Sequence, residues 1–147
     1  MKNLITKSLA DFTALFYPRC CAGCNHVLLN QEKFLCTSCL FHLPITDFHL
    51  DAHNQTANQL LGKFSFEHAA SMLTLSKDSS VENILYQIKY NNKPELAFYF
   101  GHWYGNILNK VNYLNDADAI IPIPLHRKKL KKRGYNQALV FAEGLAD

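Results

Sequence analysis

The sequence predicts an α/β protein in which a small metal-binding module precedes a domain built on a parallel sheet. Two Cys-x-x-Cys pairs near the amino end place four thiols at the spacing of a tetrahedral metal cage. A short apolar run, residues 119–124, is typical of a strand buried on both faces of a parallel sheet. It leads directly into a basic loop, residues 125–134, as at the ligand-binding edge of an open α/β sheet.

Composition places the chain among ordinary globular proteins, with 48% hydrophobic and 18% charged residues in a length of 147. That length suffices for one compact domain, or for a metal module and most of a second domain. Residues 1–16 are interpreted as an amphipathic helix, because Asp11 interrupts their apolar stretch and no cleavage site of small residues follows. No apolar stretch reaches the roughly 18 residues of a membrane span, so no transmembrane segment is expected.

The five cysteines all fall between positions 20 and 39, which favours a closed metal site with reduced thiols and therefore a cytoplasmic protein. The predicted ligands of a structural Zn²⁺ ion are Cys21, Cys24, Cys36 and Cys39. The alternative is a pair of redox-active or disulfide-linked motifs. A thioredoxin-like motif needs a strand before it and a helix after it, which Pro18 and the turn-prone AGCN do not supply.

Three further side chains near the cage are candidates for lesser roles. Cys20 is the fifth thiol and is interpreted as a bystander beside the ion. His26 and His42 lie close enough in the sequence to replace a cysteine ligand. Four cysteines already complete a tetrahedral shell, so neither histidine is needed.

The sequence divides into a metal module at 1–45, a polar linker at 46–62 and a second domain at 63–147. Histidine and aspartate residues in the linker, at positions 47–53, are interpreted as a solvated loop because their spacing matches no fixed metal cage. Residues 63–75 alternate in a way that predicts two short strands.

Three helices are expected in the second domain. Ser80 caps the first, which ends near residues 91–92 and has one apolar face. Pro94 lies in the first turn of the second, which continues to about residue 111. Asn136 caps the last.

Positive charge is concentrated near the carboxyl end. Residues 1–118 contain nine Lys or Arg and ten Asp or Glu, whereas residues 119–147 contain six and two. All six of these basic residues lie between Arg127 and Arg133. This segment is therefore the expected site of phosphate or polyanion binding, helped by the helix amino terminus at Asn136. The alternative is a solvated charged loop or helix face.

Four segments in order, FYPRCCAGC, LCTSCLFHLP, ILYQIKYNNKPELA and AIIPIPLHRKKLKKRGYNQALVFAEGLA, resemble the ComF family. Proteins of this competence-associated, GntX-like family join an amino-terminal zinc finger to a type I phosphoribosyltransferase domain, which is Rossmann-like. The resemblance covers nearly the whole chain and is most specific over residues 122–138. The family's DD-x-x-TTG motif does not occur here. The resemblance therefore implies a carboxyl-terminally truncated, catalytically incomplete fragment of such a transferase.

The resemblance also implies ligands and partners. Phosphoribosyl diphosphate, accompanied by Mg²⁺, or pyrophosphate is the expected ligand, and proteins of DNA uptake are expected partners. The matching pyrophosphate-binding residues are Leu125, His126, Arg127, Lys128, Arg133, Gly134, Tyr135, Asn136 and Gln137. The alternative is a nucleic-acid-binding accessory factor that contacts single-stranded DNA through residues 126–133, with Tyr135 stacking on bases. Its cations would be Lys129, Lys131 and Lys132.

Overall fold

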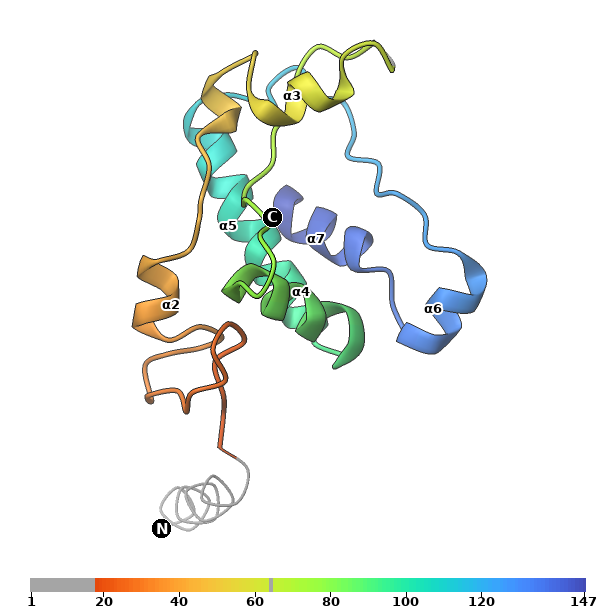
Figure 1. Ribbon diagram of the computed structural model, residues 1–147. Coiled ribbons are helices and arrows are strands. Elements are labelled where there is room, and N and C mark those ends of the chain that lie inside the picture. Colours follow the sequence, from red (N-terminus) through yellow and green to blue (C-terminus); the bar gives the residue numbers. More distant parts are fainter. Residues whose placement is uncertain (1–17, 64) are drawn as a thin grey trace.

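The computed structural model describes residues 18–63 and 65–147, and the regular elements of this part are helices joined by coil and turns, with two isolated antiparallel bridges (Figure 1). The predicted amino-terminal helix lies outside these residues. The described elements are α2 (Thr37–Phe41), the 3₁₀ helix η1 (Phe48–Leu50), α3 (Gln55–Leu60), α4 (Ser80–Tyr90), α5 (Pro94–Lys110), α6 (Arg127–Arg133) and α7 (Gln137–Ala146). The predicted linker, residues 46–62, thus contains η1 and α3.

The prediction of an α/β fold with a Rossmann-like parallel sheet is wrong for the described residues. Residues 119–124 form an extended link between α5 and α6 (Figure 1), and the side chains of Ile121 and Ile123 are 86% and 80% exposed. The link finds no neighbouring strand in this part of the chain, and Pro122 and Pro124 lack the N–H groups that a sheet ladder requires. An apolar run with nothing to pair with stays outside the core.

The two strands predicted within residues 63–75 are reduced to one isolated antiparallel bridge between Ile45 and Leu73. Its hydrogen bonds run from the Thr46 N–H to the Met72 carbonyl, at 3.0 Å, and from the Thr74 N–H to the Pro44 carbonyl, also at 3.0 Å. A single bridge of this kind cannot extend into a sheet, because the residues on either side of it turn away into bends and coil.

The predicted helices after residue 79 form close to their expected ends. Ser79, one residue before the expected cap, accepts the Glu82 N–H at 3.2 Å through its hydroxyl and begins α4. Pro94 occupies the first turn of α5. Asn136 caps α7, as predicted, by accepting the Ala138 N–H at 3.0 Å.

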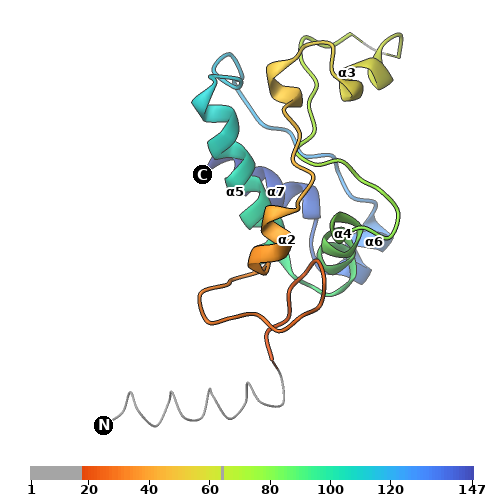
Figure 2. The same ribbon diagram turned by 60° about the vertical axis from the view of Figure 1, so that its left-hand side comes forward.

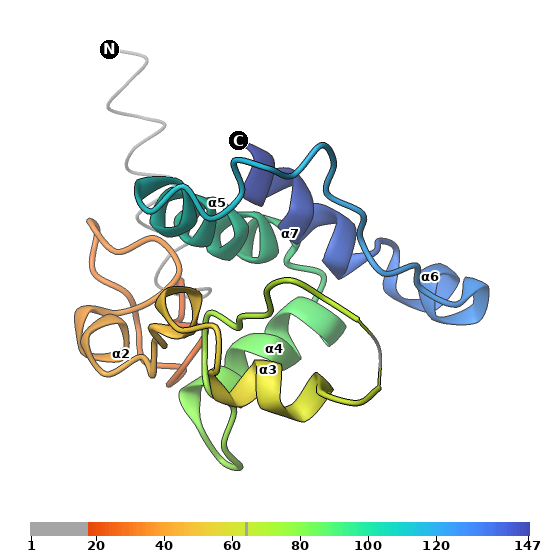
Figure 3. The ribbon, with the colours of Figure 1, turned by 90° about the horizontal axis from the view of Figure 1, so that it is seen from above.

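Helices α5 and α7 pack with their backbones in contact and lie side by side in Figure 3. Glycines lie at the contact: Gly101 and Gly105 of α5 face α7, and Gly144 of α7 faces α5. A Cβ atom at Gly105 would lie 2.6 Å from the Leu145 carbonyl oxygen, and one at Gly144 would lie 2.9 Å from the His102 nitrogen. Only glycine permits this approach.

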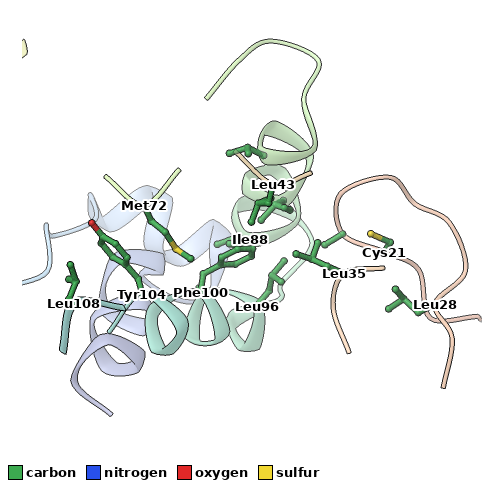
Figure 4. Close-up of a cluster of buried hydrophobic side chains, with 14 residues drawn as sticks. Cys21, Leu28, Leu35, Leu43, Met72, Ile88, Leu96, Phe100, Tyr104 and Leu108 are labelled. Carbon is green, nitrogen blue, oxygen red and sulfur yellow. The ribbon is translucent and has the colours of Figure 1, made fainter. Parts of the chain in front are cut away.

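One apolar core joins the cysteine-rich module to the helices (Figure 4). Cys21, Leu28 and Leu35 from the module continue the cluster that Leu96 and Phe100 of α5 contribute. Burial of this shared surface means that the module and the helices stabilise each other.

Asn54 is the best-connected buried polar residue among those described, at 5% exposure. Its Nδ2 group donates to the carbonyls of Phe48, Asp51 and Ala69 at 2.9, 2.7 and 2.6 Å. Its Oδ1 atom accepts the Ala57 N–H at 3.0 Å and caps α3. The side chain thereby ties η1, α3 and the segment before α4 together.

Replacing this side chain, in Asn54→Ala, is expected to lower the free energy of unfolding by about 2–3 kcal/mol, because three partly buried carbonyls lose their donor and α3 loses its cap. Urea unfolding measures the change. Gln59→Ala, at an exposed position of the same helix, is the control and should change stability by less than about 0.5 kcal/mol. Equal effects of the two substitutions would contradict the role assigned to Asn54.

Candidate functional site

The structure brings together the four cysteines that the spacing predicts. Their sulfur atoms, from Cys21, Cys24, Cys36 and Cys39, all lie within 4.8 Å of one another. The Sγ atoms of Cys24 and Cys36 are 3.6 Å apart. Tetrahedral Zn–S bonds of about 2.3 Å imply sulfur separations of about 3.8 Å, whereas a disulfide bond is about 2.05 Å long. The arrangement therefore suits a metal ion and contains no disulfide.

Local backbone structure positions each pair of sulfurs. The first pair flanks a turn in which the Asn25 N–H donates to the Cys21 carbonyl at 2.9 Å, and Asn25 itself has a φ of 62°. The second pair begins α2: Cys36 is its N-cap, and its sulfur accepts the Cys39 N–H at 3.4 Å. A turn and a helix start thus present two sulfurs each toward one point.

Backbone amides and burial shift the pKa values of Cys21 and Cys39 in opposite directions. Burial raises the pKa of Cys21, but the N–H groups of Cys36, Cys24 and Gly23 outweigh it and lower the pKa to about 7. Burial, followed by the neighbouring sulfurs, raises the pKa of Cys39 above its usual range. Four thiolates this close repel one another, and a divalent cation at their centre removes that repulsion.

The loop between the two pairs is closed by Glu32. Its carboxylate accepts the Leu29 N–H at 2.8 Å and, from Thr37, the N–H at 2.7 Å and the hydroxyl at 2.8 Å. These bonds, that from Leu29 foremost, lower the pKa of Glu32. The other side of the cluster rests on α4, where the Asn83 side chain donates to the Gly23 carbonyl at 2.8 Å.

Other candidate ligands lie outside the cluster of four. The Cys20 sulfur is 3.5 Å from the Pro18 carbonyl oxygen. The His42 ring lies against α2, with its Nδ1 atom 2.9 Å from the Ser38 carbonyl oxygen. His26 is exposed. Among the residues that the structure describes, the four predicted cysteines alone form a group with metal-ligand geometry.

The predicted basic loop is a helix, α6, over Arg127–Arg133. His126 caps it by accepting the Lys128 N–H on Nδ1 at 3.3 Å, and Gly134 ends it with a φ of 84° and an N–H that donates to the Leu130 carbonyl at 2.8 Å. Lys, Arg and Leu all favour helix, so this segment folds helically once both ends are capped.

A pocket of about 510 Å³ lies between the carboxyl end of α4 and α6, two segments that Figure 2 shows together. It is lined by five cationic side chains and three other residues: Lys89, Lys129, Lys131, Lys132 and Arg133, with Tyr90, Asn92 and Gly134. No carboxylate is among these lining residues. Five positive charges around one hollow make a site for an anion.

Contacts beside the pocket hold α6 against α4. The Tyr135 hydroxyl donates to the Ile88 carbonyl. Arg133 donates from Nη1 to the Gln137 Oε1 atom at 2.5 Å, and its guanidinium lies 5.6 Å from the centre of the Tyr90 ring. These contacts fix the side chain of Arg133 on the pocket wall.

The residues predicted to bind pyrophosphate therefore fall into two groups. Arg133 and Gly134 line the pocket, as do the three lysines assigned to nucleic acid, Lys129, Lys131 and Lys132. Residues 125–128 and 135–137 do not line it. Tyr135 braces α6, and the Asn136 Nδ2 atom donates to the Ile123 carbonyl at 3.1 Å.

Three lining residues were missed by the sequence reasoning, namely Lys89, Tyr90 and Asn92. The signal that could have found them is the segment ILYQIKYNNKPELA, one of the four that carry the ComF resemblance. The pocket also differs from the expectation in position. It lies at the carboxyl ends of α4 and α6 and not at a helix amino terminus, so side-chain cations, not helix N–H groups, would hold an anion.

Comparison of the chain with family models, curated proteins and solved structures found no match. The resemblance to the ComF family thus rests on the four sequence segments. In the described part of the chain, every helix is too short or too polar to cross a bilayer.

Proposed function

We propose that this chain binds the phosphate groups of a small anionic ligand in the pocket between α4 and α6, and that a structural Zn²⁺ ion holds its cysteine module. The ligand is pyrophosphate, or phosphoribosyl diphosphate accompanied by Mg²⁺, as the ComF resemblance implies. The observation that supports this most directly is that five cationic side chains and no carboxylate line this pocket.

Zinc is the proposed metal because of the donor set. Four thiolates are soft ligands, and a closed tetrahedral shell of four cysteines is characteristic of structural zinc. A closed shell leaves no position for a substrate. Cys21, Cys24, Cys36 and Cys39 would therefore hold the metal for stability, with no part in a reaction.

Binding, and not catalysis, is the activity that the pocket supports. In the transferases that the family resembles, the DD-x-x-TTG motif binds the 5-phosphate and the ribose hydroxyls, and this sequence does not contain it. Transfer of a phosphoribosyl group requires a positioned oxocarbenium-like centre as well as a bound diphosphate. Cations alone supply only the second requirement.

Single-stranded nucleic acid is a second candidate ligand, and one observation favours it. Arg127 and Lys128 are exposed and lie on α6 outside the pocket, so the basic surface continues along the helix beyond the volume of a diphosphate. A longer polyanion would use this extension, in line with the proposed link to DNA uptake.

Removing pocket cations is expected to weaken pyrophosphate binding. Lys89→Ala should reduce affinity about tenfold, and the double variant Lys131→Ala, Lys132→Ala should reduce it further, because each lost charge removes attraction to the diphosphate. Isothermal titration calorimetry at fixed ionic strength measures both. Lys110→Ala, at the exposed end of α5, is the matched control and should bind like the unaltered chain.

Two results would count against this proposal. One is a pyrophosphate affinity that none of the pocket variants changes. The other is an equal loss from Lys110→Ala, which would indicate a nonspecific effect of net charge. If single-stranded DNA binds instead, log affinity should depend less steeply on log salt concentration in the double variant. The change in slope should correspond to the loss of about two phosphate contacts.

A further inference from the structure

We propose that the ligand of the α4–α6 pocket carries a nucleobase, which stacks on the exposed rings of Tyr86 and Tyr90. This inference rests on the proposed binding of phosphate in the same pocket, and it adds a second subsite. A free nucleotide and an unpaired nucleotide of a single strand share this chemistry, because both join a base to phosphate.

The two tyrosines form an open aromatic surface on α4. Their side chains are exposed, at 56% for Tyr86 and 59% for Tyr90. They lie one helical turn apart, with ring centres 4.9 Å apart and ring planes inclined by 47°. Tyr90 also lines the cationic pocket, so the aromatic surface and the pocket are adjacent and share this residue.

Arg133 connects the two subsites. Its guanidinium lies over the Tyr90 ring at 5.6 Å from the ring centre, and the Gln137 side chain holds it in place. An arginine fixed on an aromatic ring offers a cation to phosphate and, with the ring, a flat surface to a base. A ligand with both groups would therefore contact α4 and α6 at once.

The competing explanation is that the tyrosines only stabilise α4, since aromatic residues four apart on a helix attract each other. That role needs no ligand and predicts no change in binding when either ring is removed. Stacking instead predicts that affinity depends on the rings and differs little from one base to another, since every base has a π-face.

The test compares adenosine diphosphate with pyrophosphate by isothermal titration calorimetry on the full chain. We expect the nucleotide to bind about tenfold more tightly than pyrophosphate. Tyr86→Leu should reduce this difference, because only the Tyr90 ring remains, while leaving pyrophosphate affinity unchanged, because Tyr86 lies outside the pocket lining. Tyr86→Phe should retain the difference, since it keeps the ring. Phe41→Leu, at an 84% exposed aromatic residue of α2, is the control and should change neither affinity.

The outcomes separate this inference from the proposal beneath it. Equal affinities for nucleotide and pyrophosphate, with no effect of Tyr86→Leu, would overturn the base subsite and leave the phosphate pocket standing. Absence of binding by nucleotide, pyrophosphate and an eight-nucleotide single strand alike would overturn both. If an eight-nucleotide single strand binds in a Tyr86-dependent way and the free nucleotide does not bind, the base subsite is supported and its ligand is a single strand. Circular dichroism of each variant establishes that the variant is folded.

Discussion

Replacing Cys39 with serine is expected to unfold the cysteine module and to destabilise the whole chain. Cys39 is one of four sulfurs within 4.8 Å of one another, and loss of one ligand leaves an incomplete shell. The free energy of structural zinc binding is on the order of 10 kcal/mol, comparable to the entire stability of a typical domain. Because Cys21, Leu28 and Leu35 share the core with α5, the unfolding should extend to the helices.

The measurement is thermal unfolding by circular dichroism, with zinc content determined by elemental analysis. The unaltered chain should contain one zinc ion, and a strong chelator should reproduce the behaviour of Cys39→Ser. Cys20→Ser is the matched control: its sulfur lies outside the cluster, so metal content and stability should persist. Metal bound equally well by both variants would refute the ligand set, and a purified chain without metal would refute the site.

Replacing Gly144 with alanine is expected to separate α5 from α7. The added Cβ would overlap the Phe98 carbonyl oxygen and lie 2.9 Å from the His102 nitrogen, and neither backbone atom can rotate away. Overpacking of this kind costs about 3 kcal/mol, which exceeds the gain of about 1 kcal/mol that alanine usually brings to a helix. The melting temperature should fall by roughly 4–8 °C.

Differential scanning calorimetry measures this fall. Glu143→Ala is the control, because it introduces the same residue into the same helix at an exposed position. Its melting temperature should stay within about 2 °C of that of the unaltered chain. A stability gain in Gly144→Ala would show that the helices can move apart without cost, contrary to the close contact described above.

Features encoded locally could be predicted from the sequence. Pro94 and Asn136 mark the starts of α5 and α7 because capping depends on one or two residues. The cysteine spacing likewise predicts four converging sulfurs, since a turn and a helix start bring each pair together within four residues.

Features that depend on distant partners could not. An apolar run at 119–124 is suitable for a buried strand, but pairing requires a neighbour that its own residues do not specify. The pocket depends on Tyr135 reaching Ile88, 47 positions away, which sets Lys89 opposite α6. The ComF assignment stays a proposal that the pyrophosphate and nucleotide experiments can support.

The extended link before α6 also bears on how the protein behaves when concentrated. Successive N–H groups in an extended chain point to opposite sides, so Pro122 and Pro124 remove the donors from one side of the link. On the other side, the Ile123 carbonyl already accepts the Asn136 side chain at 3.1 Å. The exposed isoleucines therefore belong to a backbone segment that is a poor template for amyloid-like stacking. The six positive charges of the adjoining helix α6 also make two copies of this region repel each other.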